Sequence, residues 1–181
     1  MQNNTPVALP RVRHRLLVRE TTILLGISIA LPFLVHLIPS QTVPWGARFL
    51  PIFLAPLLGV VLYRLHVGLV PAILAPLLNY LITGSPIPSV VGVLTLELTV
   101  FAVAAYWMLK SWPRLWLAGP IGYLAAKGAS AIAISVLPWL TSLRPGHEFA
   151  ARSIETAIPG LLLLAAATLL AIQVRNRSGR E

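Results

Sequence analysis

Residues 90–109 read VVGVLTLELTVFAVAAYWML, an apolar stretch with one acidic residue, Glu97, near its middle. Residues 116–140 read WLAGPIGYLAAKGASAIAISVLPWL and carry one basic residue, Lys127, in a similar setting. About 20 apolar residues are enough to cross a bilayer as a helix. A charge near the bilayer centre costs about 2.5–3.5 kcal/mol on insertion scales, so such residues usually face the protein interior and mark a ligand or ion path.

The composition of the whole chain indicates a membrane protein. Its 181 residues are 57% hydrophobic and 10% charged, whereas a soluble domain carries about 25% charged residues. The net charge of +9 would suggest nucleic-acid binding in a soluble protein. Here the basic residues flank apolar stretches, which is typical of topology signals and lipid contacts. Because the chain has no cysteine, disulfides and thiolate metal sites are excluded.

The hydropathy pattern predicts six membrane-spanning helices, at residues 21–38, 49–64, 67–83, 89–109, 115–138 and 156–174. The predicted fold class is therefore an all-α membrane protein with six transmembrane helices in a compact bundle. The bundle covers residues 21–174, between a basic amino-terminal tail (1–20) and a basic carboxy-terminal tail (175–181). An even number of spans leaves both termini on the same side of the membrane.

Basic residues are distributed unevenly between the two sides of this bundle. The side of the termini carries ten of them: Arg11, Arg13, Arg15, Arg19, Arg64, Lys110, Arg114, Arg175, Arg177 and Arg180. The opposite side carries three: Arg48, Arg144 and Arg152. Because cytoplasmic segments are enriched in arginine and lysine, we expect a multi-pass protein of the cytoplasmic membrane with both termini in the cytoplasm.

Motifs of common enzyme chemistry are absent from the sequence. It contains no G-x-x-x-x-G-K-[ST] loop for ATP, no H-E-x-x-H and no G-x-S-x-G. We therefore expect no enzyme activity, no metal and no cofactor. A hydrolase that combines Lys127 with Ser130 or Ser135 is the weakest alternative, because serines in membrane helices more often bond to backbone or to neighbouring helices.

Glu97 and Lys127 are expected at similar depth on adjacent spans, and two interpretations stay open. They form a buried ion pair that fixes helix packing, or they line a pocket that opens outward. Residues 141–156 are expected to form the longest outer loop. Polar and aromatic residues of the outer half complete the predicted substrate-binding set: Trp45, Arg48, Asn79, Tyr80, Trp139 and Arg152. The two tryptophans suit stacking on a flat ring.

Several short segments, in order, resemble one family of membrane proteins. They are Gly26-x-x-x-Ala30, Arg48-Phe-Leu-Pro51, Pro76-Leu-Leu-Asn-Tyr-Leu-Ile-Thr-Gly84-Ser-Pro86, Glu97-Leu-Thr-Val-Phe101 and Ile158-Pro-Gly160. With the basic amino terminus, they make the chain similar to the substrate-binding S component of energy-coupling factor (ECF) vitamin transporters. Lys127-Gly128 stands where many relatives have Gly-Arg.

The resemblance implies a function in transport. The protein would capture a vitamin or related micronutrient from the outer side, with Glu97 as the leading ligand contact and Lys127 next. It would then dock, through Gly26 and Ala30, on the transmembrane coupling protein EcfT. Two cytoplasmic ATPase subunits would supply the energy, which accounts for the missing ATP loop.

Two other functions are compatible with the same residues. A non-transporting membrane scaffold or assembly protein would use Glu97 and Lys127 only to hold its helices together. An independent secondary carrier would transport its substrate alone, driven by an ion gradient.

Overall fold

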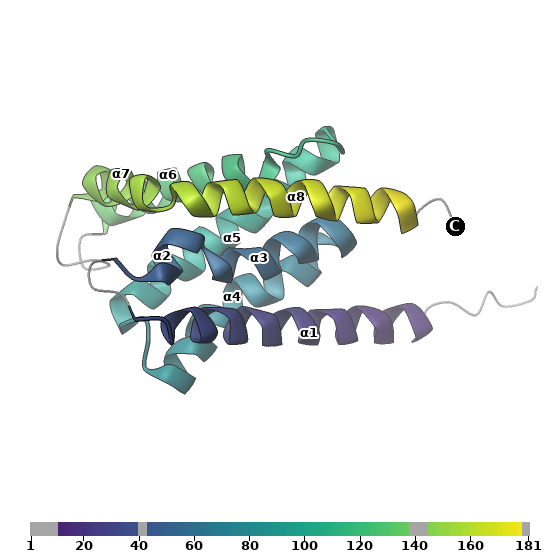
Figure 1. Cartoon of the computed structure of the whole chain (residues 1–181), viewed down its shortest axis with the longest axis horizontal. Coiled ribbons are helices and arrows are strands. Elements are labelled where there is room, and N and C mark those ends of the chain that lie inside the picture. Colours follow the sequence, from purple (N-terminus) through teal and green to yellow (C-terminus); the bar gives the residue numbers. More distant parts are fainter. Residues whose placement is uncertain (1–10, 40–42, 138–144, 179–181) are drawn as a thin grey trace, which may run out of the picture.

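The computed structural model describes residues 11–39, 43–137 and 145–178. Within these ranges every regular element is a helix, and the long helices run side by side (Figure 1). In chain order the helices are α1 (Arg11–His36), α2 (Trp45–Phe49), α3 (Pro51–Leu58), the π-helix η1 (Gly59–Tyr63), α4 (Leu65–Thr83), α5 (Pro88–Ser111), α6 (Ala118–Val136), α7 (Gly146–Thr156) and α8 (Ile158–Ser178). The prediction of an all-α protein is confirmed.

Five segments of the described chain are long and apolar enough to cross a membrane, and they identify a multi-pass membrane protein. They are Leu17–Val35, Trp45–Tyr63, Leu65–Thr83, Pro88–Ser111 and Ile158–Arg177. Many large apolar side chains in these helices are exposed, including Phe33, Leu81 and Leu170. Such a surface is stable against lipid tails, whereas soluble proteins rarely expose contiguous apolar area of this extent.

Helix α6 is not among these five segments. Its 19 residues equal α4 in length, but Lys127 and several glycines and serines lower its hydropathy. The helix packs against α5, α7 and α8, and one side of it is buried in the bundle, including Lys127 and Ser130. A helix that hides its polar residues against protein in this way needs less apolar sequence than a helix in contact with lipid on most sides.

The second predicted span consists of α2, α3 and η1, and its helix is interrupted once, between α2 and α3. The break lies at Leu50, whose φ of 54° and ψ of 41° are left-handed, and Pro51 opens α3. A residue before proline is disfavoured in the right-handed helical region, so the chain turns here instead of continuing α2. Leu50 is buried, and so are Pro51 and Phe53 in the first turn of α3.

Three aromatic residues from separate helices form the centre of the core. The Phe53 ring of α3 meets the Phe101 ring of α5 edge-on at 5.1 Å between centroids, with an interplanar angle of 89°. The Tyr123 ring of α6 packs on the other side of Phe53 at 5.3 Å and 70°. Edge-to-face pairs of this kind contribute about 0.5–1.5 kcal/mol beyond area burial. The cluster therefore joins α3, α5 and α6.

Helices η1 and α4 approach closely because glycine lies at the contact on both sides. A Cβ added at Gly59 would lie 2.7 Å from the Gly68 Cα, and one added at Gly68 would lie 2.6 Å from the Pro56 carbonyl oxygen. Either contact is too short for a real side chain, so the packing of this helical hairpin depends on both glycines.

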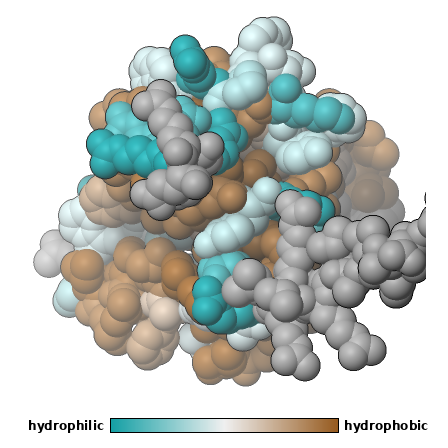
Figure 2. Space-filling model, turned by 90° about the vertical axis from the view of Figure 1, so that its right-hand side faces the viewer, coloured by the Kyte–Doolittle hydropathy of each residue, from teal (hydrophilic) through white to brown (hydrophobic). Residues whose placement is uncertain are grey.

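The start of α1 and the end of α8 lie at the same end of the bundle (Figure 1). Figure 2 looks onto this end, where hydrophilic residues gather between apolar flanks. Exposed basic residues of the described chain on the connecting turns and helix ends here are Arg64, Lys110, Arg114 and Arg177. Four of the ten basic residues that the sequence assigned to the side of the termini therefore lie at one end of the molecule.

Three further predicted segments differ from the structure. Helix α1 begins at Arg11, inside the predicted amino-terminal tail, and α8 continues to Ser178, inside the predicted carboxy-terminal tail. The expected outer loop 141–156 contains α7 from Gly146 onward. Pro145 precedes this helix and Glu148 lies in its first turn, where an acidic side chain favours the helix dipole. These start signals identify a helix in a segment too short and polar to span the membrane.

Candidate functional site

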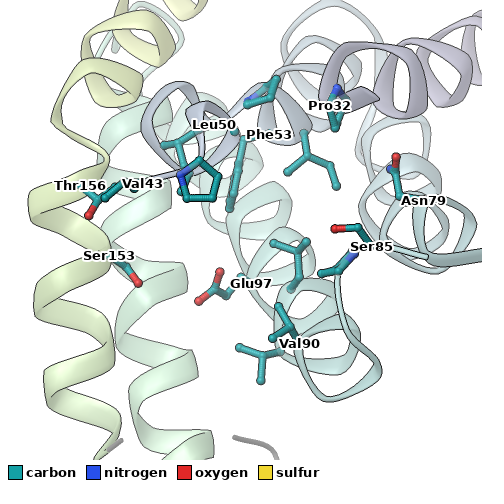
Figure 3. A pocket seen from close by; sticks show the side chains of 18 of the residues that line it. Pro32, Val43, Leu50, Phe53, Asn79, Ser85, Val90, Glu97, Ser153 and Thr156 are labelled. Carbon is teal, nitrogen blue, oxygen red and sulfur yellow. The ribbon is translucent and has the colours of Figure 1, made fainter. Parts of the chain in front are cut away.

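A cavity of about 730 Å³ lies at the end of the bundle opposite the start of α1 and the end of α8. Helices α1 to α7 all contribute to its wall, and Figure 3 shows the side chains from close by. Most of the lining is apolar, with Pro32, Leu50, Phe53 and Val90 among the contributors. Its volume lies in the range of about 300–1,000 Å³ that is typical of small-molecule sites.

Glu97 and Lys127 form an ion pair in the wall of this cavity. The Lys127 Nζ donates to Glu97 Oε1 at 2.7 Å and to Oε2 at 2.8 Å. Glu97 is 2% exposed and Lys127 is 6% exposed. The prediction that they lie at similar depth on adjacent helices is confirmed, and the pair also reaches the cavity. Removal of either partner would leave an uncompensated buried charge.

Two aromatic rings enclose the Lys127 ammonium group. Its Nζ lies 5.3 Å from the centre of the Tyr123 ring and 5.1 Å from that of Phe149, within the range of cation–π attraction. The Tyr123 hydroxyl donates to the Ser153 carbonyl oxygen at 3.3 Å and so connects α6 to α7. The ammonium group is thus held by one carboxylate and two ring faces.

Helix α7 covers one side of the cavity with a single face. Phe149, Arg152, Ser153 and Thr156 all line it, and their spacing of three and four residues places them on one side of a helix. In Figure 3 the Ser153 hydroxyl and the Glu97 carboxylate face the same space. Arg152 is exposed as well as cavity-lining, so this residue lies at the mouth of the cavity.

Asn79 lines the cavity from α4 and also joins two helices. Its Nδ2 donates to the Ser28 carbonyl oxygen of α1 at 3.2 Å and to the Ala75 carbonyl oxygen at 2.9 Å. The bond to Ser28 joins α1 to α4, whereas the bond to Ala75 lies within α4. With both bonds made by Nδ2, the Oδ1 acceptor remains for a ligand. Asn79 is thus a wall residue that also stabilises the bundle.

Other predicted site residues lie away from this cavity. The Trp45 ring stacks on Phe49 at 5.7 Å, its Nε1 donates to the Pro39 carbonyl oxygen at 3.2 Å, and the Arg48 guanidinium lies 5.2 Å from its ring centre. Arg48 lines a separate depression of about 360 Å³ together with Glu155. Tyr80 is half-buried on α4 and is not among the cavity-lining residues. Trp139 lies outside the described residues.

The aromatic part of the site was not predicted from the sequence. Phe53, Tyr123 and Phe149 all line the cavity, but Phe53 and Tyr123 look like ordinary apolar residues of their spans. Phe149 had a usable signal, because Phe149, Ser153 and Thr156 recur at helical spacing in a segment interpreted as a loop.

The predicted docking residues Gly26 and Ala30 are both exposed on α1. A Cβ built at Gly26 meets no atom within 4 Å, so the protein itself does not need a glycine here. The surface around these two small residues is open to another helix.

No family model, curated protein or solved structure matches this chain.

Proposed function

We propose that this protein is the ligand-capturing S component of an ECF-type importer for a vitamin or related micronutrient. The observation that carries the proposal is the cavity of about 730 Å³ at one end of an apolar bundle, with the ion pair of Glu97 and Lys127 in its wall. A large apolar cavity with a few convergent polar groups is the arrangement of small-molecule sites.

The proposed topology has six crossings, with α6 as the fifth in chain order and both termini in the cytoplasm. It is supported by the start of α1 and the end of α8 at one end of the bundle and by the basic residues on that face. Because basic residues favour the cytoplasmic side, the cavity would open to the outside. Ligand would then be captured from the outer medium.

Energy for uptake would come from partner proteins, since the chain has no ATP-binding loop. The exposed Gly26 and Ala30 on α1 suit a close approach by a helix of the transmembrane coupling protein, because small residues let two helix backbones come near. Two cytoplasmic ATPases would act through that coupling protein.

Uptake into liposomes tests the proposal. The full chain is reconstituted alone and with a coupling protein and its two ATPases, and import of the compound identified by mass spectrometry of the purified protein is measured. Import only with the partners and ATP is the expected result. Import by the chain alone in an ion gradient would establish a secondary carrier instead, and a protein that binds and transports nothing would point to a scaffold.

The site is tested by Glu97→Gln, with Glu148→Gln as the matched control. Glu97 lines the cavity, whereas Glu148 is exposed on α7 and is not a lining residue. Affinity for the ligand is expected to fall at least tenfold, or about 1.4 kcal/mol, in Glu97→Gln only. Equal affinity in the two variants would refute the assignment of Glu97.

A further inference from the structure

The charges in the cavity wall do not cancel. Among the described lining residues, the charged ones are Glu97, Lys127 and Arg152. Glu97 and Lys127 neutralise each other through contacts of 2.7 and 2.8 Å. Arg152 therefore leaves the cavity with a net charge of about +1, since arginine is always protonated in proteins.

Lys127 is a poor position for a ligand anion. Its ammonium group already contacts both oxygens of Glu97 and two aromatic rings. A second carboxylate brought to Lys127 would lie beside that of Glu97, and two like charges so close together repel each other. An uncharged polar group meets no such repulsion and is compatible with the pair.

Arg152 is better suited than Lys127 to bind a ligand anion. In the part of the chain that the structure describes, no carboxylate forms an ion pair with it. Its neighbours on α7, Glu148 and Glu155, do not line the cavity, and Glu155 borders the smaller depression with Arg48. A guanidinium group binds a carboxylate with two parallel hydrogen bonds, and this one lies at the mouth of an apolar space.

We propose that the ligand is a monoanion, an apolar or aromatic body with one carboxylate. The carboxylate pairs with Arg152, and the body lies deeper, among the rings of Phe53, Tyr123 and Phe149 that line the cavity. The inference rests on the proposed function in taking this cavity as the ligand site, and it adds the charge and orientation of the ligand.

Three probes of one shape test the charge: 1-naphthaleneacetate, 1-naphthaleneacetamide and 1-naphthylmethylammonium. Their binding to the full-length protein in lipid nanodiscs is measured by equilibrium dialysis, with naphthalene fluorescence as the readout. The carboxylate is expected to bind at least tenfold more tightly than the amide or the amine, a difference of about 1.4 kcal/mol.

Variants test whether Arg152 causes the preference for the carboxylate. Arg152→Gln is expected to abolish the preference for the carboxylate, and Arg152→Lys to retain part of it, because lysine keeps the charge without the bidentate geometry. Arg64→Gln, at an exposed arginine that is not a lining residue, is the matched control and should leave all three affinities unchanged.

Other results separate this inference from the proposed function. Tighter binding of the amide or the amine, or a carboxylate preference that survives Arg152→Gln, overturns the monoanion and leaves the capture function standing. If none of the probes binds, mass spectrometry of the co-purified compound decides: an anion supports the inference, and a neutral or cationic compound overturns it. A protein that holds neither probe nor co-purified compound contradicts both proposals.

Discussion

Replacing Lys127 by methionine tests how much the buried ion pair with Glu97 contributes to the stability of the bundle. The substitution keeps a long flexible side chain but removes the ammonium group that donates to both oxygens of Glu97 at 2.7 and 2.8 Å. The carboxylate, 2% exposed as the protein stands, is then left without its cation. Breaking a buried pair in this way costs about 3–5 kcal/mol, whereas replacing both partners by apolar residues of similar volume is often neutral or stabilising.

The double variant Glu97→Met/Lys127→Met is therefore expected to lie within about 1 kcal/mol of the parent. Each single variant is expected to lose several times that free energy of unfolding. The free energies are measured by titration of dodecylmaltoside micelles with sodium dodecyl sulfate, followed by circular dichroism at 222 nm. Lys110→Met, at an exposed lysine of the same charge, is the control and should cost less than about 1 kcal/mol.

Two results would refute this reasoning. A loss below about 1 kcal/mol in Lys127→Met would mean that the Glu97 carboxylate is well solvated, against its burial. A double variant that loses the sum of the two single losses would mean that the residues do not interact. Ligand affinity adds a second distinction: a double variant that regains stability and also keeps full affinity would restrict the pair to a packing role.

Three further substitutions test the helix contacts and the docking surface. Gly68→Ala places a Cβ 2.6 Å from the Pro56 carbonyl oxygen, and it is expected to lower the free energy of unfolding by about 1–3 kcal/mol in the same titration. Asn79→Leu removes bonds of 3.2 and 2.9 Å to the Ser28 and Ala75 carbonyl oxygens and leaves the buried Ser28 carbonyl oxygen without this donor, for an expected loss of about 1–3 kcal/mol. Gly26→Leu fills an open surface, so stability and ligand affinity should change little while ATP-driven uptake with the partner subunits falls at least tenfold.

Gly68→Ala has a matched control, and each of the other two predictions has a result that would contradict it. Gly128→Ala adds a Cβ that meets nothing within 4 Å, so it should be harmless where Gly68→Ala is not. Asn79→Leu that unfolds like the parent would show that α1 does not need the amide. Unchanged uptake by Gly26→Leu would remove α1 from the docking surface, and loss of ligand affinity in that variant would mean that the substitution disturbs the site itself.

Much of the fold could be predicted from the sequence, because a membrane-spanning helix is determined by residues that are close together in the chain. Its length and hydropathy are set by a bilayer about 30 Å thick, and its backbone hydrogen bonds lie within one segment. The bounds of α4 and α5, Leu65–Thr83 and Pro88–Ser111, lie close to the predicted spans. The break at Leu50 was harder to predict, because the proline after it disfavours a continuous helix without specifying the left-handed turn.

The candidate site also has a part that was predictable from the sequence and a part that depends on helix packing. Glu97 and Lys127 were recognisable from sequence alone, since an isolated charge in an apolar span requires a partner or a ligand. That each is the other's partner depends on how α5 packs on α6, and the enclosure of Lys127 by Tyr123 and Phe149 depends on α7 as well. Trp45 and Arg48 share the outer half with the cavity but contact each other instead, because a shared depth does not specify which way a side chain points.

Composition and the spacing of apolar residues thus established a multi-pass helical membrane protein with two charges hidden in its interior. The burial cost of a charge applies wherever the helix lies, so this conclusion needed no knowledge of neighbours. The cavity, the pairing of those charges, the aromatic rings around Lys127 and the position of Arg152 at the mouth came only from the packed helices. They depend on contacts between residues far apart in the chain, and no local pattern encodes the side on which two helices meet.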